Sequence, residues 1–348
     1  MIYHRNTFND HGHSVLLDER FNTTILHLTY HELTGLRKDH WLVQMDGILN
    51  IVKQKNIKLI IMDTSGDPVD IDYNHKGWSS SYREQMHMLN KHCRTIIITD
   101  DWNYWYKPND DIRYFGRTLW HQSQLNVNDT TIDKTKPLMC LNRNLEWHRI
   151  YLLYLFHDKA WFNDIDYSFM FELGDVLEPS DSNLDKPSFT IEEIQTLKSI
   201  KLPINLKDET DNSVPEWSKI DNPAYGDNAI NLVTETSASE YPGITLTEKT
   251  AKPIMSYQIP VLVAPRGSEK YLEDNGIDMF SDYVPWKIWN NIEDDKERVA
   301  RIATWIDQIM QNPKDILDIH RQVHQRLQTN KQHFHSEIFR NSLTEQLY

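Results

Sequence analysis

One buried strand flanked by two helices constrains the fold of this chain more than any other feature. Residues 259–264 (IPVLVA) form an apolar run that is short enough for a buried strand. An amphipathic segment precedes this run, and a turn with proline and glycine at 265–267 follows it. Ser268 can then cap a second helix, which Gly276 can end in the left-handed conformation. Residues 240–282 therefore predict helix, strand, turn and helix.

The start of the first of these helices carries an acid and a base side by side. Thr247, Glu248 and Lys249 lie where a loop enters the helix, so backbone N–H groups converge there and the helix dipole favours an anion. Such a pair can bind a ribose and a phosphate together. A second interpretation stays open. Thr245 and Glu248 have the spacing of a capping box, which would make Glu248 a structural residue and leave Lys249 and Lys252 in solvent.

Further apolar runs alternate with helical patterns along the chain. The predicted strands are 23–30, 58–62, 95–99, 138–141, 167–173 and 229–233, and the predicted helices include 145–157, 191–200, 294–310 and 315–327. Strands that alternate with helices imply an α/β fold with a parallel sheet. In such sheets, ligands bind beyond the carboxyl ends of the strands.

A polar segment at 130–137 (TTIDKTKP), closed by a proline, predicts a linker that divides the chain. We expect an N-terminal domain over 1–135 and a second α/β domain over 136–311. Residues 312–348 then form a C-terminal helical segment that can cross back to the first domain.

Four aspartates follow the predicted strands of the first domain: Asp63, Asp67, Asp100 and Asp101. A carboxylate at such a strand end can serve as a general base. An aromatic cluster at 102–106 follows directly, and it predicts either core packing or a platform for an acceptor sugar.

Two passages of the chain resemble a known family. The pattern TEK-x-x-KP-I, an apolar strand and G-S-x-x-YL-x-x-x-G is similar to the nucleotide-sugar-binding segment of a glycosyltransferase group. That group is related to the α-1,3-fucosyltransferases and the exostosin-like enzymes and has many viral and bacterial members. The matching residues are Thr247, Glu248, Lys249, Lys252, Pro253, Ile254, Gly267, Ser268, Tyr271, Leu272, Gly276, Phe280 and Tyr283. The second passage, Leu141-Asn142-Arg143 with His148-Arg149, resembles the group's LNR-x-x-x-x-HR. Ile277 departs from the group's phenylalanine, and residues 286–290 replace a more acidic stretch.

The resemblance implies a fold and an activity. The fold is α/β of the GT-B type, with two Rossmann-like domains facing across a cleft. The activity moves a sugar from a nucleoside-diphosphate sugar to a carbohydrate or other hydroxyl acceptor, without a metal and with inversion. The residues that it implies for nucleotide-sugar binding are Arg143, Arg149, Glu235, Thr247, Glu248, Lys249 and Lys252, and the base would come from Asp63, Asp67, Asp100 or Asp101. Arginine suits a diphosphate because its planar fork of donors matches phosphate oxygens.

Composition narrows the functional classes. A net charge of −14 opposes strong non-specific contact with DNA or anionic membranes. Neither common Gly-rich phosphate motif is present, so side chains and helix ends would hold a phosphate. Cys93 and Cys140 have no metal-ligand spacing, and the D-x-D tripeptides at 70–72 and 164–166 are common by chance, so we expect no metal and no cofactor. The sequence has no signal pattern and no membrane-spanning apolar run, which favours a cytoplasmic protein.

Two alternative functions stay open. The first is a phage-type glycosyltransferase that modifies a base of DNA, which the basic, His-rich residues 328–348 permit. The second is a non-catalytic protein that binds a nucleotide or a sugar.

Overall fold

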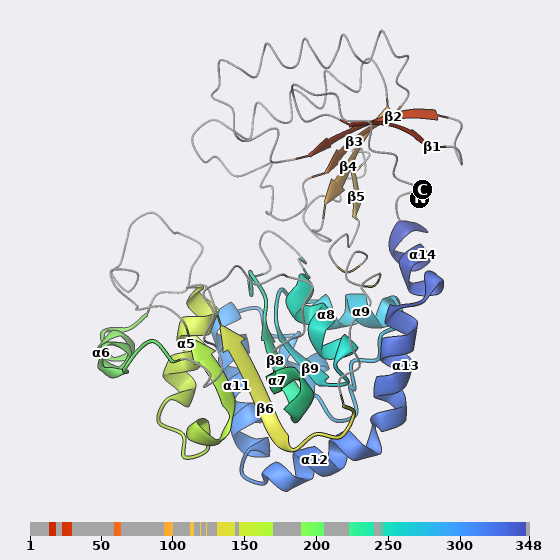
Figure 1. The fold of residues 1–348 in the computed structure, drawn as a ribbon. Coiled ribbons are helices and arrows are strands. Elements are labelled where there is room, and N and C mark those ends of the chain that lie inside the picture. Colours follow the sequence, from red (N-terminus) through yellow and green to blue (C-terminus); the bar gives the residue numbers. More distant parts are fainter. Residues whose placement is uncertain are drawn as a thin grey trace. The chain divides into compact units, whose positions relative to one another are not determined.

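The chain divides into two compact units, each built around its own sheet (Figure 1). The computed structural model describes residues 14–18, 23–29, 59–63, 94–99, 112–114, 119, 123, 131–142, 146–169, 189–204, 223–239, 244 and 246–345. The first unit comprises Met1–Arg117 with Leu343–Tyr348, and the second comprises Thr118–Ser342. The boundary that we predicted after residue 135 falls within the second unit, and the three-part division stays a prediction.

The first unit contains a five-stranded sheet in the order β1-β2-β3-β4-β5. Its strands are β1 (Ser14–Asp18), β2 (Thr23–Thr29), β3 (Leu59–Asp63), β4 (Arg94–Thr99) and β5 (Ile112–Tyr114). β1 is antiparallel to β2, and the remaining neighbours are parallel. The strands predicted at 23–30, 58–62 and 95–99 are therefore confirmed. Asp63 is the last residue of β3, in register with Thr29 and Ile98, so it lies at the carboxyl end of the parallel strands.

The second unit contains a fully parallel four-stranded sheet in the order β7-β6-β8-β9, which confirms the α/β class. The strands are β6 (Lys136–Asn142), β7 (Asp166–Phe169), β8 (Asn228–Thr234) and β9 (Ile259–Val263). Every residue of β8 and of β9 is buried. Because helices cover both faces of such a sheet, its strands contain short runs of mostly apolar residues, which is why the sequence predicted them well.

The segment predicted as a linker is anchored to the second unit. The Lys134 ammonium lies within 3.0 Å of four backbone carbonyl oxygens, those of Thr131, Tyr225, Gly226 and Ser256. The Thr135 N–H donates to the Asp227 carbonyl at 2.9 Å. β6 then begins at Lys136. The Lys134 ammonium and the Thr135 N–H are thus bonded to backbone carbonyls of the second unit, whereas Thr131 and Asp133 are exposed.

Helices surround this sheet and run to the end of the described chain. Their bounds are α5 (Trp147–Phe156), η1 (Phe162–Asp164), α6 (Ile191–Ser199), α7 (Pro223–Asp227), α8 (Glu248–Met255), α9 (Ser268–Asp274), α10 (Trp286–Trp289), α11 (Asp295–Ile309), α12 (Pro313–Gln322), α13 (His324–Phe334) and α14 (Glu337–Glu345). α5 packs against α6 and α11, whereas α8 packs against β8, β9 and α13 (Figure 1). No helix within these described ranges has the length and apolar character needed to cross a bilayer.

A capping residue and an apolar stripe explain why the helix predicted at 294–310 forms as α11. The Asp294 side chain caps α11 by accepting from the Glu297 N–H at 2.7 Å, and Val299, Ile302 and Ile306 form its buried face. The single helix predicted at 315–327 is instead two helices, α12 and α13. They meet at Val323, which is buried and departs from helical geometry with φ −96° and ψ 7°.

Candidate functional site

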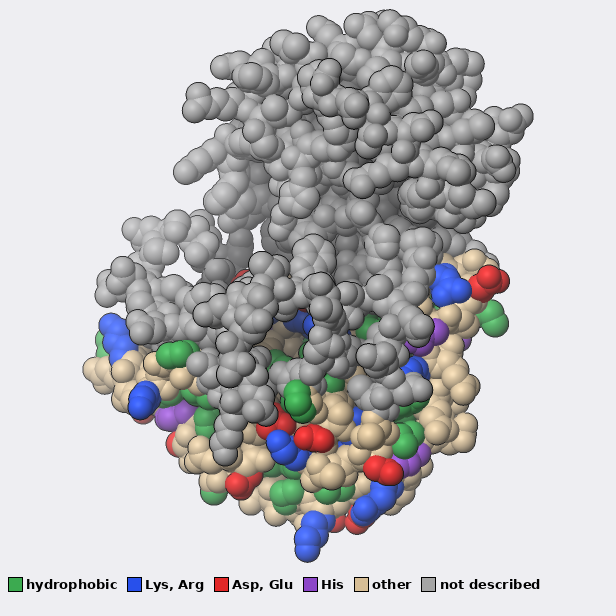
Figure 2. Space-filling view, in the orientation of Figure 1, with side chains coloured by type: hydrophobic (Ala, Val, Ile, Leu, Met, Phe, Trp, Pro, Cys, Tyr) green, Lys and Arg blue, Asp and Glu red, His purple; other side chains and the backbone are tan. Residues whose placement is uncertain are grey.

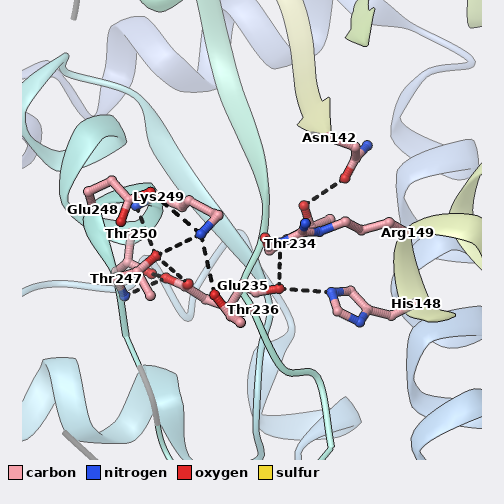
Figure 3. A network of polar contacts seen from close by, with 10 residues as sticks. All are labelled: Asn142, His148, Arg149, Thr234, Glu235, Thr236, Thr247, Glu248, Lys249 and Thr250. Atoms are coloured by element: carbon pink, nitrogen blue, oxygen red, sulfur yellow. Dashed lines mark hydrogen bonds and ion pairs between the residues drawn. The ribbon is translucent and has the colours of Figure 1, made fainter. Parts of the chain in front are cut away.

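The candidate site lies at the carboxyl end of the second sheet, between β6 and β8 (Figure 3). The chain leaves β6 through α5 toward β7 on one side, and it leaves β8 through α8 toward β9 on the other. Connections that diverge in this way mark a topological switch point, where open α/β sheets bind their ligands. The Thr234 hydroxyl at the end of β8 donates to Asn142 Oδ1 at the end of β6 at 2.7 Å, and both residues are buried.

Two residues at the start of α5 hold the end of β8. Arg149 is only 2% exposed, and its Nη2 donates to the carbonyl oxygens of Thr234 and Glu235, both at 2.9 Å. His148 Nε2 donates to the same Glu235 carbonyl at 2.9 Å. Burial, together with the neighbouring Arg149 charge, holds the pKa of His148 well below its ordinary value, so the ring is neutral at pH 7. α5 is therefore fixed to β8 through backbone carbonyls.

The Glu235 carboxylate occupies the start of α8, where the sequence predicted an external anion. Glu235 is 0% exposed. Its Oε1 accepts from the Thr247 N–H at 2.9 Å and from Thr250 Oγ1 at 2.6 Å, and its Oε2 accepts from Thr247 Oγ1 at 2.6 Å. The buried carboxylate thus complements the positive end of the helix dipole from within the chain. Its oxygens bond to the protein, although the resemblance had implied a contact with ligand.

Glu248 does not take part in a capping box. The N-cap of α8 is Thr247, whose Oγ1 accepts from the Lys249 N–H at 3.3 Å, and Glu248 is the first helical residue. A capping box needs its acid at the third helical position, so that alternative is wrong. The Glu248 side chain is 25% exposed, and its Oε1 lies 3.5 Å from Lys249 Nζ. Its carboxylate therefore stays accessible to a ligand.

The Lys249 ammonium lies over the start of α8 and beside the loop that follows β8. Its Nζ is 3.1 Å from Thr247 Oγ1 and 3.5 Å from Thr236 Oγ1, and the side chain is 32% exposed (Figure 3). Lys249 and Arg149, which are far apart in the sequence, thus reach the same strand end.

Lys252 lies elsewhere. Its Nζ is 5.8 Å from the ring centroid of Tyr225 in α7, the helix that precedes the amino end of β8. Because α8 runs back along the sheet, residues further along the helix approach the amino end of the strands. Lys252 thus approaches α7, at the opposite end of the sheet from the described site residues Arg149, Glu235 and Lys249.

Several predicted site residues lie outside the described residues. These are Arg143, Asp67, Asp100 and Asp101. Asp63 is described as the end of β3 in the first unit.

Sequence reasoning missed a second buried arginine near the strand ends. Arg298 of α11 donates through Nη1 to the Ala264 carbonyl at 2.7 Å and through Nη2 to the Ala238 carbonyl. It thereby ties the connection after β8 to the end of β9. A signal was present, since Arg298 shares the helical spacing of the buried Ile302 and Ile306 and a charge on that stripe is unusual.

Metal ligands are not gathered among the described residues. Within that part of the chain, no group of three or more His, Cys, Asp or Glu side chains could hold a metal ion. One of the two D-x-D tripeptides includes Asp166, which accepts from Lys136 Nζ at 2.8 Å and from Asn228 Nδ2 at 2.6 Å. Asp166 begins β7, so these contacts lie at the amino end of the sheet, away from the candidate site.

Comparisons of the chain with family models, with curated proteins and with solved structures find no match.

Proposed function

We propose that the protein is a glycosyltransferase that moves a sugar from a nucleoside-diphosphate sugar to a hydroxyl acceptor. The observation that carries this proposal is the meeting of two sequence passages, 142–149 and 234–249, at the switch point of a parallel sheet. We further propose two Rossmann-like domains facing across a cleft, with the nucleotide on the second domain and the acceptor on the first.

The proposed catalytic effect is stabilisation of the leaving diphosphate. Its negative charge grows in the transition state, so a cation that is already in place lowers the barrier. Lys249 suits this role because two threonine hydroxyls lie within 3.5 Å of its ammonium. Arg149 adds positive charge at the same strand end, although its Nη2 is engaged with backbone carbonyls. Arg143 is the proposed further phosphate ligand.

The remaining roles follow from exposure and position. Glu248 is proposed to accept hydrogen bonds from the ribose hydroxyls, since its carboxylate is partly exposed beside Lys249. The acceptor hydroxyl would be deprotonated by one of the aspartates that end or follow β3 and β4, namely Asp63, Asp67, Asp100 or Asp101. Attack on the face opposite the leaving group would invert the anomeric centre.

The DNA-modifying alternative gains no support from the described side chains on the face shown in Figure 2. On the face shown in Figure 2, the described Lys and Arg side chains are interspersed with Asp and Glu side chains. A protein that binds duplex DNA more often gathers its basic residues on one face. The net charge of −14 points the same way.

A screen of sugar nucleotides tests the proposal. The full chain is incubated with UDP-, GDP-, ADP-, TDP- and CMP-linked sugars, each with and without duplex DNA or a mixture of simple glycoside acceptors, and release of the free nucleotide is measured. We expect acceptor-stimulated release from one of the diphosphate donors. Binding of a nucleoside diphosphate without turnover of any donor would instead favour a non-catalytic binding protein.

A further inference from the structure

Glu235 is held from two sides by two different helices. Its backbone carbonyl accepts from His148 and Arg149 of α5, both at 2.9 Å. Its carboxylate accepts from Thr247 and Thr250 at the start of α8, at 2.6 to 2.9 Å. The residue is fully buried, and Figure 3 shows it at the centre of these contacts. Glu235 therefore joins the starts of α5 and α8 at the switch point.

We propose that Glu235 is a positioning residue that sets the Lys249 ammonium for the ligand's diphosphate. The proposal rests on the function proposed above only in naming that ligand. Its structural part is a chain of three groups: the Glu235 carboxylate, the Thr247 hydroxyl and the Lys249 side chain.

The direction of the Thr247 hydroxyl hydrogen decides how the Thr247 oxygen interacts with Lys249. A hydroxyl has one hydrogen to donate and two lone pairs. An ionised carboxylate only accepts, so at 2.6 Å the Thr247 hydrogen must point to Glu235 Oε2. The lone pairs of Thr247 Oγ1 are then left for Lys249, whose backbone N–H and Nζ lie at 3.3 Å and 3.1 Å. With glutamine at position 235, an amide N–H could donate to Thr247, and the hydroxyl hydrogen would turn toward the ammonium.

A spectroscopic experiment on Lys249 tests this without assuming any activity. The lysines of the full chain are reductively methylated with ¹³C-formaldehyde, and the Lys249 dimethylamine signal is assigned by its loss in Lys249→Arg. We expect Glu235→Gln and Thr247→Val to shift this signal, whereas Thr247→Ser, which keeps the hydroxyl, leaves it in place. In calorimetric titrations with UDP and GDP, the first two variants should bind about tenfold more weakly than Thr247→Ser.

Glu269→Gln is the matched control. Glu269 is a second buried carboxylate, in the first turn of α9, and it accepts from Trp289 Nε1 at 3.3 Å and from Asn290 Nδ2 at 3.0 Å. The same acid-to-amide change there should move neither the Lys249 signal nor nucleotide affinity.

Each outcome separates the two proposals. An unchanged Lys249 signal in Glu235→Gln overturns the positioning role, whatever the protein binds. If the unsubstituted chain binds neither UDP nor GDP, the proposed function fails while the signal still decides the role of Glu235. If Glu235→Gln does not fold, the comparison of Thr247→Val with Thr247→Ser takes its place, because Thr247→Val removes the hydroxyl that lies between the Glu235 carboxylate and Lys249. A Lys249 signal that is the same in Thr247→Val and Thr247→Ser then overturns the proposal.

Discussion

Replacement of Arg149 by alanine should lower stability more than it lowers ligand affinity. The guanidinium makes two hydrogen bonds to the carbonyls of Thr234 and Glu235, and the side chain is almost fully buried. Hydrogen bonds from a charged donor contribute about 1.5 kcal/mol each to folding. Truncation of the buried stem adds a cavity term of about 1–2 kcal/mol. Relief from burying a charge offsets part of this loss. We therefore expect a net decrease of about 3 kcal/mol in the free energy of unfolding.

The assay is urea unfolding of the full chain, followed by tryptophan fluorescence and by far-UV circular dichroism. Arg149→Lys keeps the positive charge but loses the planar fork of donors. Its free energy of unfolding should therefore lie between those of the unsubstituted chain and Arg149→Ala. Arg301→Ala, on the exposed face of α11, is the control and should change the free energy of unfolding by less than about 0.5 kcal/mol. If Arg149→Ala lost nucleotide affinity and kept full stability, Arg149 would be a ligand contact, and our reading of its buried contacts would be refuted.

Three further changes test other parts of the structure. Burial raises the pKa of the Cys140 thiol to about 12, so in a Cys93→Ser variant DTNB should label the protein at pH 8 only as fast as it unfolds; immediate labelling of the native chain would contradict this. Gly276 has φ +83°, and a Cβ added there would lie 2.5 Å from His333 Nε2. Gly276→Ala should therefore decrease the free energy of unfolding by about 2 kcal/mol and lower the Tm. An unchanged Tm would show that the turn adapts freely. Burial lowers the pKa of His320 to about 4, below the 6.5 of the unfolded chain, so acidification from pH 6.5 to 4 protonates the unfolded state first and should remove about 3 kcal/mol of stability. His320→Gln should flatten this dependence, and equal slopes in the two proteins would exclude His320 as its source.

The strands of the second unit could be predicted because their physical cause is local. Residues 229–233 and 259–264 are mostly apolar, as is typical of strands buried on both faces, and they form β8 and β9. The exception is Asn231, which is buried and donates through Nδ2 to Gln258 Oε1 at 3.0 Å. The convergence of Arg149 and Lys249 at one strand end was also predictable, since parallel strands place their carboxyl ends at the same edge.

The partners of individual side chains could not be predicted in the same way. The start of α8 depends on Glu235, twelve residues before Thr247, and this contact exists only once β8 and α8 have packed. The same contact fills the helix end that the sequence predicted for an external anion. Lys134 looked like part of a solvated linker because its four carbonyl partners include three from distant parts of the chain.

The role of Lys249 in nucleotide binding is measured by calorimetric titration of UDP and GDP into the unsubstituted chain, Lys249→Ala and Lys252→Ala. The two lysines lie on the same helix, but only Lys249 lies at the switch point. We predict that the unsubstituted chain binds one of the two nucleotides and that Lys249→Ala weakens this binding about tenfold or more. Lys252→Ala should bind the nucleotide as tightly as the unsubstituted chain does. Equal affinity in all three proteins, or binding of neither nucleotide by the unsubstituted chain, would contradict this prediction.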